Sequence, residues 1–406
     1  MSIIIQKFGG SSLTSEACRE QAVHHILKQK ANGKKVVVVV SAMGRKGDPY
    51  ATDTLLKLLD YQNGMYIENR EKDLLLHCGE IISATVLANM LVKHQQRAIV
   101  LTGSQAGIIT TDEYTDAQII EIKTERILRE LYDNKVVIVT GFQGISRSGE
   151  ITTLGRGGSD TTATALGAAL NAECCDIFTD VDGVMTADPS IVPDARKLQT
   201  ITYHQICNLA YQGAKVIHPR AVEVAMQKKM PIHIRSTFHD ENGTLVTDEI
   251  AAGSQLEQTN KFEHILTGIT QMPRLTQIQI YAGEGQYDLQ MKVFGIMAEN
   301  HISVDFINVN MNSVAYTVSD EDSQLALAVL REAGIEPVVE HHCAKISCIG
   351  SLMKGVPGVM AKIIKTLTIE NIRILQSADS HTTIWVLVKD QDMEKGVRAL
   401  HKAFYL

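Results

Sequence analysis

The sequence contains few cysteines and no stretch of apolar residues long enough to cross a membrane. Its seven cysteines are an odd number without a C-x-x-C pair, which argues against a disulfide framework. The apolar runs have the length of strands, well below the roughly 20 residues that a membrane span needs. The chain also begins directly in an apolar strand, without the regions that mark a signal peptide. We therefore expect a cytoplasmic protein with no membrane partner.

An excess of positive charge is missing too. The chain has 39 Lys and Arg residues against 46 Asp and Glu residues, a net charge of −7, which gives no reason to expect nucleic acid as a partner. His341, His342 and Cys343 are adjacent, but structural zinc needs four ligands and no second cluster accompanies them. We expect these three residues to form an ordinary strand end, and we predict no metal site made by the protein alone.

Strands and helices alternate along the first 240 residues. Apolar runs predict strands at 3–8, 36–41, 98–102, 136–140, 177–181 and 232–236. Helical periodicity predicts helices at 15–30, 69–92, 124–132, 160–170, 203–211 and 220–227. This order predicts a mostly parallel sheet covered by helices on both faces. With 406 residues the chain is long enough for two or three domains, and we expect residues 1–245 to form one large α/β domain.

The character of the sequence changes near residue 245. Asp240–Gly243 is a turn signal, and residues 247–260 are polar without a clear period. A weak repeat follows, because the segments from Ile278 and from Ile346 each predict strand, helix, strand, strand and helix. Two such units of ~70 residues suggest ferredoxin-like modules, which we place at residues 264–337 and 343–406. The repeat suits either a duplicated structural domain or a ligand sensor, and composition does not decide between them.

Three predicted strands end in glycine-rich or small-residue turns. Residues 152–164 read TTLGRGGSDTTAT and open a helix of small residues, Gly9-Gly10 follows the first strand, and residues 41–44 follow the five-valine run. A helix N-terminus with glycines and a nearby cation favours anion binding. Because ligands of open α/β sheets lie beyond the carboxyl ends of the strands, Lys7 is expected to face such a site. The alternatives are a plain glycine-rich turn and a solvated lysine at a strand end.

Four motifs together resemble aspartate kinase. They are KFGGSSL at 7–13, GFQG at 141–144, TTLGRGGSDTTA at 152–163 and FTDVDGVMTADP at 178–189. The resemblance covers essentially the whole chain and implies an amino-acid-kinase domain, a carbamate-kinase-like αβα sandwich with a mostly parallel sheet, followed by two ferredoxin-like ACT domains. The chain is similar to the monofunctional bacterial enzymes. Two further segments look most like the diaminopimelate-sensitive type of bacilli, and they read SAMGRKGDPYATD and NLAYQGAKVI.

The resemblance implies phosphorylation of the β-carboxylate of L-aspartate by ATP, giving 4-phospho-L-aspartate. A carboxylate with an ordinary pKa of ~3.9 is ionised at neutral pH, so this nucleophile needs no general base. Catalysis is then expected to rest on positioning and positive charge. Mg²⁺ is expected to bind through ATP, without a ligand set of its own in the protein. The chain lacks a Walker A motif and protein-kinase signatures, which agrees with this family.

The resemblance also assigns roles to individual residues. Lys7 and Asp160 are the predicted catalytic residues, with Lys7 on the transferring phosphoryl group. Arg156 is expected to clamp a carboxylate of aspartate, a task that suits a guanidinium, and Glu80 to pair with the substrate ammonium. The other substrate-binding residues are predicted to be Ser41, Thr52, Gly157, Gly158 and Ser159. The cofactor-binding residues are predicted to be Lys7, Phe8, Gly9, Gly10, Thr179, Asp180, Met185, Thr186, Ala187, Asp188, Pro189 and Lys215. Without the resemblance to the family, we would interpret Glu80 as an acid in a salt bridge. Asp160 would be an acid that the helix dipole stabilises at a helix N-terminus.

Two departures from the family concern phosphate binding and regulation. Ser190 stands where the family often has arginine after the ADP run. Residues 355–358 read GVPG, the ligand-loop pattern of ACT domains, whereas residues 282–288 lack the Pro-Gly. Feedback by diaminopimelate, lysine or threonine is expected around Asp288, Val304 and Asn308, within a homo-oligomer joined through ACT domains. The segment 264–270 is a candidate for a strand exchanged into the second ACT domain.

Three other interpretations remain. A kinase of the same fold acting on glutamate or acetylglutamate shares the glycine loops but normally lacks two ACT domains. A pure amino-acid sensor with an inactive kinase domain is disfavoured by the intact Lys7, Arg156, Asp160 and Lys215. An NAD-binding α/β protein lacks support, because no G-x-G-x-x-G follows the first strand.

Overall fold

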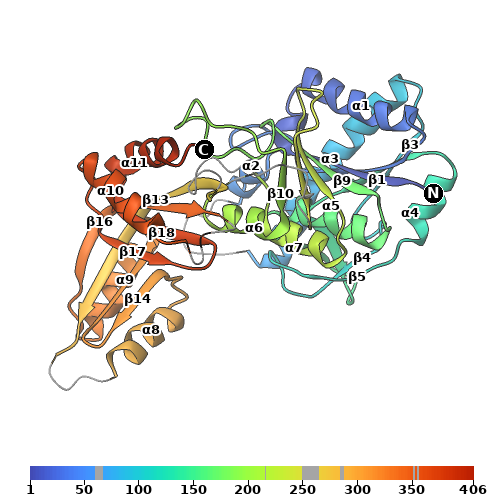
Figure 1. The fold of residues 1–406 in the computed structure, drawn as a ribbon. Helices are drawn as coiled ribbons and strands as arrows, with labels where there is room; N and C mark the ends of the chain where they lie inside the picture. Colours follow the sequence, from blue (N-terminus) through green and yellow to red (C-terminus); the bar gives the residue numbers. More distant parts are fainter. Residues whose placement is uncertain (60–66, 215, 249–264, 284–287, 351–352, 354–355) are drawn as a thin grey trace. The chain divides into compact units, whose positions relative to one another are not determined.

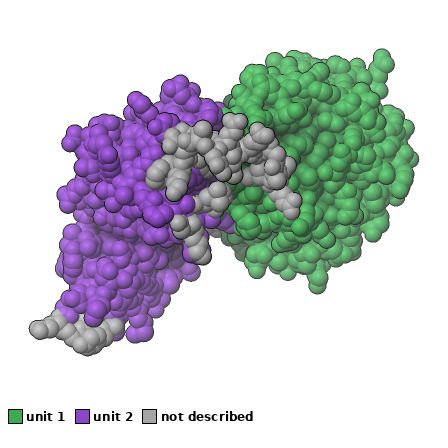
Figure 2. Space-filling view, in the orientation of Figure 1, with its two compact units in different colours: residues 1–184, 197–210, 215–255 green, residues 185–196, 211–214, 256–406 purple. Residues whose placement is uncertain are grey.

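The computed structural model describes residues 1–59, 67–214, 216–248, 265–283, 288–350, 353 and 356–406. The chain forms two compact units (Figure 2). The first, here called the kinase unit after the family that its motifs resemble, comprises the described residues of 1–184, 197–210 and 215–255. The second, here called the ACT unit after the same resemblance, comprises the described residues of 185–196, 211–214 and 256–406. Predicted residues Lys215 and His264 lie outside the described residues.

The kinase unit is built on a mostly parallel sheet, as the sequence predicts (Figure 1). Among the described residues its strand order is β10-β12-β11-β9-β1-β2-β6-β3, and only β11 and β12 pair antiparallel. The strands are β1 (Ile3–Phe8), β2 (Lys35–Val40), β3 (Ala98–Leu101), β6 (Val136–Thr140), β9 (Cys174–Thr179), β10 (Thr200–Thr202), β11 (Ile232–Ser236) and β12 (Thr244–Thr247).

Helices cover both faces of this sheet. Val36, Val38 and Val40 of β2 pack with α1 (Glu16–Ala31) and α3 (Asn69–Lys93), whereas α5 (Gly158–Ala169) contacts β1, β2 and β9 from the other face. All five valines of β2 are fully buried, because a strand inside a two-sided α/β sandwich has no solvent face. The remaining helices of the unit are η1 (Gly10–Leu13), α2 (Thr52–Lys57), α4 (Glu125–Tyr132), α6 (Tyr203–Tyr211) and α7 (Pro219–Gln227).

Helix α3 corrects the expectation that apolar runs are only strand-length. Among the described residues it is one helix long and apolar enough to cross a membrane. However, it packs against β2, β3, β6 and β8 of the kinase unit. It also buries two acids, Asp73 and Glu80, on the side that faces the protein. It is therefore a core helix, whose apolar length reflects burial inside the unit.

A small second sheet was not predicted. Its order is β5 (Ile119–Ile122), β4 (Ile108–Thr110), β7 (Gln143–Ser146) and β8 (Ile151–Thr153). These strands have three or four residues and carry polar side chains such as Gln143 and Thr152, so they have little of the apolar signal that marks the main sheet. Strand β9 also differs from prediction: it begins at Cys174 and ends at Thr179, because Cys174 and Cys175 pair with Ile4 and Ile5 of β1.

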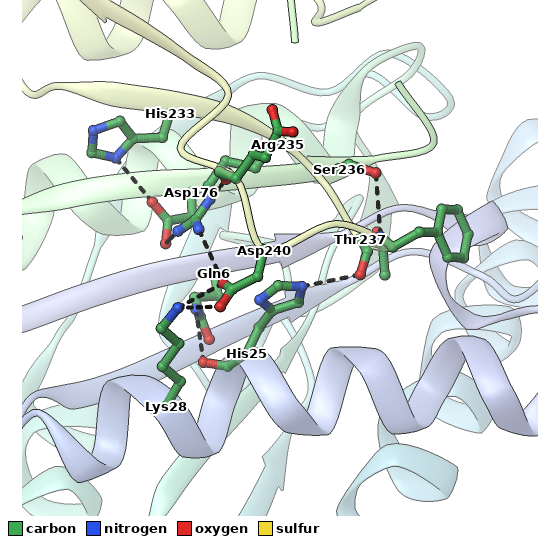
Figure 3. A network of polar contacts seen from close by, with 11 residues as sticks. Gln6, His25, Lys28, Asp176, His233, Arg235, Ser236, Thr237 and Asp240 are labelled. Atoms are coloured by element: carbon green, nitrogen blue, oxygen red, sulfur yellow. Dashed lines mark hydrogen bonds and ion pairs between the residues drawn. The ribbon is translucent and has the colours of Figure 1, made fainter. Parts of the chain in front are cut away.

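A polar network joins α1 to β9 and β11 (Figure 3). The Asp176 carboxylate lies 3.0 Å from His233 Nδ1 and 3.6 Å from Arg235. His25 Nε2 lies 3.0 Å from the Thr237 carbonyl oxygen, and burial lowers the pKa of His25. The Thr237 hydroxyl lies 2.6 Å from that of Ser12, just beyond Gly9-Gly10. The network thus fixes the carboxyl end of β11 beside the first glycine turn.

In its described residues the ACT unit is an antiparallel sheet with helices packed on it (Figure 1). Its order among the described residues is β14-β15-β13-β16-β18-β17. Its elements are β13 (Gly268–Tyr281), α8 (Leu289–Glu299), β14 (Asp305–Asn310), β15 (Ser313–Ser319), α9 (Asp320–Glu332), β16 (Val338–Ile349), α10 (Val359–Ile369), β17 (Gln376–Asp379), β18 (Thr383–Lys389) and α11 (Asp390–Ala403).

Two long strands divide the ACT unit into two halves. The first part of β13, Gly268–Met272, pairs with the end of β16, while Leu275–Tyr281 pairs with β15. A register shift separates the two parts after Met272. One hydrophobic core lies under α8 and α9 and another under α10 and α11. The segment before the first repeat therefore supplies a strand to the second half.

Candidate functional site

A cleft in the kinase unit collects most residues that the sequence predicts for substrate and phosphate. Its volume is about 670 Å³, and it lies beyond the carboxyl ends of β1 and β2. The predicted residues that line it are Lys7, Gly10, Ser41, Thr52, Glu80, Arg156, Gly157, Gly158, Ser159 and Asp160. They come from strand ends, from α2 and α3, and from the start of α5, so segments far apart in the sequence meet here.

Lys7 and Asp160 form an ion pair in the cleft. Lys7 Nζ lies 2.6 Å from Asp160 Oδ1, and both side chains are largely buried, at 12% and 14% exposure. The other carboxylate oxygen accepts a weak hydrogen bond, at 3.4 Å, from the backbone N–H of His218. Asp160 therefore holds the lysine ammonium at the end of β1, where the charge faces the cleft.

The start of α5 requires glycine at two positions. Gly157 has φ +69°, and a Cβ there would lie 2.1 Å from the His218 ring. A Cβ on Gly158 would lie 2.8 Å from the Phe142 ring. The chain can therefore turn into the helix here only without side chains, which leaves the helix N-terminus open to an anion.

Glu80 is a buried acid with one free oxygen. It is 2% exposed, its Oε1 accepts a hydrogen bond of 3.1 Å from the Ala42 N–H, and its Oε2 has no hydrogen-bond partner among the described residues. Burial raises the pKa of Glu80 to about 8, although the bond from Ala42 acts in the opposite direction. The alternative interpretation of Glu80 was a salt-bridged acid, but Glu80 forms no salt bridge with any described residue. A cation that enters the cleft could therefore pair with the free oxygen of the Glu80 carboxyl group.

Asp73 was missed by the sequence interpretation. It is fully buried, and its carboxylate accepts hydrogen bonds from the Thr153 N–H at 2.8 Å, the Thr153 hydroxyl at 2.6 Å and the Thr115 N–H at 3.0 Å. Burial raises its pKa, and the three bonds lower it. Thr115 and Thr153 line the cleft, so Asp73 ties α3 to two residues of the cleft lining. The available signal was an acid seven residues before Glu80, on the same face of a helix.

Arg156 lies on the turn between two glycines of positive φ, Gly155 and Gly157. Its side chain is exposed, and it forms no ion pair with the described residues of the structure. Among the described residues, the Arg156 guanidinium is therefore free at the rim of the cleft.

Ser41 follows β2 and donates its backbone N–H to the Phe8 carbonyl at 3.1 Å.

Part of the predicted nucleotide set lies at the neighbouring strand end. Thr179 is the last residue of β9, and Gly9 N–H lies 3.4 Å from the Phe178 carbonyl oxygen. Phe8 is fully buried and its ring stacks on that of Phe178, with 4.7 Å between centroids. Only the backbone of Phe8 is therefore available to a ligand. Asp180 pairs with Arg45, a cleft residue to which the sequence interpretation gave no role.

The rest of the predicted nucleotide set, Met185–Pro189, belongs to the ACT unit. The Thr186 hydroxyl lies 2.9 Å from His401 Nε2, and the Thr186 carbonyl accepts a bond of 2.8 Å from Ile269. Ala187 packs in the core under α10 and α11. Ser190, at the position of the expected arginine, donates its hydroxyl to Asp188 at 2.6 Å.

Among the described residues, the three predicted effector residues lie in different parts of the ACT unit. Asp288 precedes α8 and lines a hollow of about 200 Å³. Asn308 lines another, of about 350 Å³, together with glutamines and asparagines of β13, β14 and β17. Val304 packs against the first ACT core.

One group of possible metal ligands occurs among the described residues. Cys174, Asp176 and His233 bring their ligand atoms within 4.8 Å of one another. Burial raises the pKa of Cys174 to about 12, which keeps the thiol protonated. Arg235 also approaches Asp176. A thiol and a competing guanidinium do not suit Mg²⁺, which prefers oxygen ligands.

Comparison with known proteins agrees with this architecture. Residues 2–236 match the amino acid kinase family, and residues 338–402 match an ACT domain. The chain is 52% identical over 406 residues to Aspartokinase 1 of Bacillus subtilis, covering all of both chains. It resembles the crystal structure of E. coli aspartokinase III in complex with aspartate and ADP, with a TM-score of 0.79, 25% identity and full coverage of both chains. The same E. coli enzyme in complex with lysine and aspartate gives a TM-score of 0.77, at 25% identity and full coverage of both chains.

The fold and the cleft therefore define an amino acid kinase that carries ACT domains. Full-length identity to curated relatives narrows this class. The chain belongs to the aspartokinase family and is an aspartate kinase.

Proposed function

We propose that the cleft of the kinase unit is where the γ-phosphoryl group of ATP is transferred to the β-carboxylate of L-aspartate, giving ADP and 4-phospho-L-aspartate. The observation that carries the proposal is the meeting of a Lys7–Asp160 ion pair, an unpartnered buried Glu80 and an exposed Arg156 in one cleft. These groups complement an amino acid with two carboxylates next to a polyphosphate.

Each charge of the substrate then has a partner. The free oxygen of Glu80 takes the ammonium, and Arg156 binds a carboxylate with its paired N–H groups. Ser41, Thr52, Gly157, Gly158 and Ser159 complete the pocket. The β-carboxylate attacks without a general base, because it is already ionised at neutral pH.

The phosphoryl group is stabilised by charge and position. Lys7, fixed by Asp160, lies at the end of β1 beside Gly9 and Gly10, where it neutralises the charge that spreads over the phosphoryl oxygens. Thr179 and Asp180 bind the nucleotide from the end of β9. Mg²⁺ bound through ATP supplies additional positive charge to the phosphates.

Regulation and location complete the proposal. The reaction is the first step toward lysine, diaminopimelate, threonine and methionine, and it takes place in the cytoplasm. A feedback amino acid (diaminopimelate, lysine or threonine) binds near Asp288, Val304 and Asn308 in a homo-oligomer formed through the ACT domains. Asp288 and Asn308 each line a hollow of the ACT unit that has room for polar groups of a ligand.

The test is hydroxamate formation with ATP, Mg²⁺ and L-aspartate, run in parallel with L-glutamate. We expect product from aspartate alone and its loss in Lys7→Ala. Lys46→Ala is the matched control, because this exposed lysine lines the same cleft without an assigned role. Product from glutamate at a similar rate, or full activity of Lys7→Ala, would contradict the proposal.

A further inference from the structure

Arg45 lies in the turn between β2 and α2 and lines the cleft. Two glycines of positive φ, Gly44 and Gly47, enclose Arg45 and Lys46. The arrangement repeats that of Arg156 between Gly155 and Gly157. Two arginines on glycine-bounded turns therefore reach the same cleft from different loops, and only Arg156 has a role so far.

The backbone of this turn is fastened to the first glycine turn. Gly44 N–H donates to the Gly10 carbonyl at 3.0 Å. A Cβ on Gly10 would lie 2.6 Å from the Gly44 carbonyl oxygen, so the two loops pack with no room for a side chain. The backbone of Arg45 therefore lies next to the residues that are expected to hold the transferring phosphoryl group.

Hydrogen bonds within the turn fix its shape. Arg45 N–H donates to the Asp48 carboxylate at 2.7 Å, and Asp48 N–H donates to the Arg45 carbonyl at 2.9 Å. Gly47 N–H donates to the Thr54 hydroxyl at 3.2 Å. The main chain is therefore held, and the long side chain is the part that can reorient.

The Arg45 guanidinium pairs with the Asp180 carboxylate, which follows the end of β9. The Arg45 side chain is 68% exposed and the Asp180 side chain 36%. A pair this exposed contributes little to stability, whereas a guanidinium binds phosphate through two strong parallel hydrogen bonds. A polyphosphate entering beside Gly9-Gly10 would therefore displace Asp180 readily.

We propose that Arg45 is a phosphate-binding residue of the nucleotide site, which exchanges the Asp180 carboxylate for the terminal phosphates of ATP. The inference rests on the proposed function and adds a cation to it. Asp180 keeps the guanidinium at the site when no nucleotide is bound, and the fastened turn limits the movement to the side chain.

The test compares Arg45→Gln and Arg45→Lys with Lys46→Gln, which removes the same charge from the same turn. Affinities for ADP and AMP are measured by calorimetry and competition, and KM values for ATP and aspartate by the coupled kinase assay. We expect Arg45→Gln to weaken ADP binding and to raise KM for ATP by about tenfold, from the loss of a charge-assisted hydrogen bond. AMP affinity and KM for aspartate should change by less than about twofold, and Arg45→Lys should recover part of the loss.

Other outcomes overturn the inference. Equal weakening of ADP and AMP would mean that Arg45 only shapes the loop, and an equal loss in Lys46→Gln would mean that the turn acts through net charge. An unchanged Arg45→Gln enzyme would also exclude it. These results differ from failure of the proposed function, in which the wild-type chain itself forms no aspartyl hydroxamate.

Discussion

The kinase unit and the ACT unit distribute their polar groups differently. The kinase unit concentrates them beyond the strand ends of a parallel sheet, where the buried Glu80 and the exposed Arg45 and Arg156 line a cleft of about 670 Å³. The ACT unit has an antiparallel sheet, and its described residues form smaller hollows of about 350 and 200 Å³. Parallel strands bring their carboxyl ends to one edge, so loops from distant segments converge there. The cleft proposed for catalysis is therefore lined by loops of the kinase unit, whereas the proposed regulatory site is one that we propose a second chain completes.

The largest effect is predicted for Asp160→Asn. The Lys7 ammonium loses the carboxylate that lies 2.6 Å away, so the charge at the phosphoryl group is no longer held in place. We expect kcat to fall by roughly 10²–10³, with a smaller change in KM for aspartate. Steady-state hydroxamate kinetics measure both, and a kcat within about threefold of wild type would remove Asp160 from the catalytic set.

The second prediction concerns the protonation of Glu80. Its pKa of about 8 means that the free enzyme holds this carboxyl group largely protonated at pH 7, while pairing with an ammonium requires the ionised form. We expect kcat/KM for aspartate to rise with pH up to about 8 and then level off. Glu80→Gln should lower kcat/KM by about tenfold or more and lose this rise.

Stability gives an independent measurement of the same group. An exposed glutamate has an ordinary pKa of 4.5, and the folded protein raises it. The folded state therefore binds more protons than the unfolded state between pH 4.5 and about 8, and stability falls as pH rises through this window. Glu80→Gln should unfold at a higher temperature than wild type at pH 8, with little difference at pH 5. The opposite ordering would place the Glu80 carboxylate in a favourable ionic environment.

Asp73→Asn tests the part of the cleft lining that Thr115 and Thr153 form. An amide keeps one oxygen acceptor, but its NH₂ group faces donors from Thr153 or Thr115. We expect a loss of about 2 kcal/mol in the free energy of unfolding and a rise in KM for aspartate with kcat little changed. Urea unfolding and steady-state kinetics give the two values. Asp53→Asn, at an exposed acid of α2 on the cleft rim, is the control.

The smallest effect is predicted in the ACT unit. His401→Leu removes one of the hydrogen-bond partners of the Thr186 hydroxyl, and we expect a loss of about 1 kcal/mol in stability. The kcat without effector should stay within about twofold of wild type. The concentration of feedback amino acid that gives half inhibition should change. A large loss of kcat would contradict this prediction, because it would show that catalysis depends directly on contacts inside the ACT unit.

The fold was largely predictable because its main strands are buried on both faces. The valine run of β2 and the apolar run of β1 have the length and the β-branched composition of buried strands, and their alternation with longer segments predicted the helices. The sheet of β4, β5, β7 and β8 was missed, since strands of three or four residues with polar side chains have no distinct pattern. The start of β9 was misplaced because Cys174 and Cys175 gave no β-branched signal.

The candidate site was predictable where glycine motifs mark it. Lys7, Gly10, Arg156 and Asp160 follow or form such motifs and meet in the cleft. Asp73 was not predictable, because its role depends on Thr115 and Thr153, which lie far away in the sequence. For Met185–Pro189 the motif identified the segment, but the burial of Thr186 and Ala187 in the ACT unit depends on tertiary packing.

The most direct test of the account is a crystal structure of the chain with L-aspartate, ADP and Mg²⁺. The account predicts the aspartate ammonium within hydrogen-bonding distance of Glu80, a substrate carboxylate on Arg156, and the ADP phosphates beside Gly9, Gly10 and Lys7. Aspartate bound outside this cleft, or bound here with its ammonium away from Glu80, would contradict it.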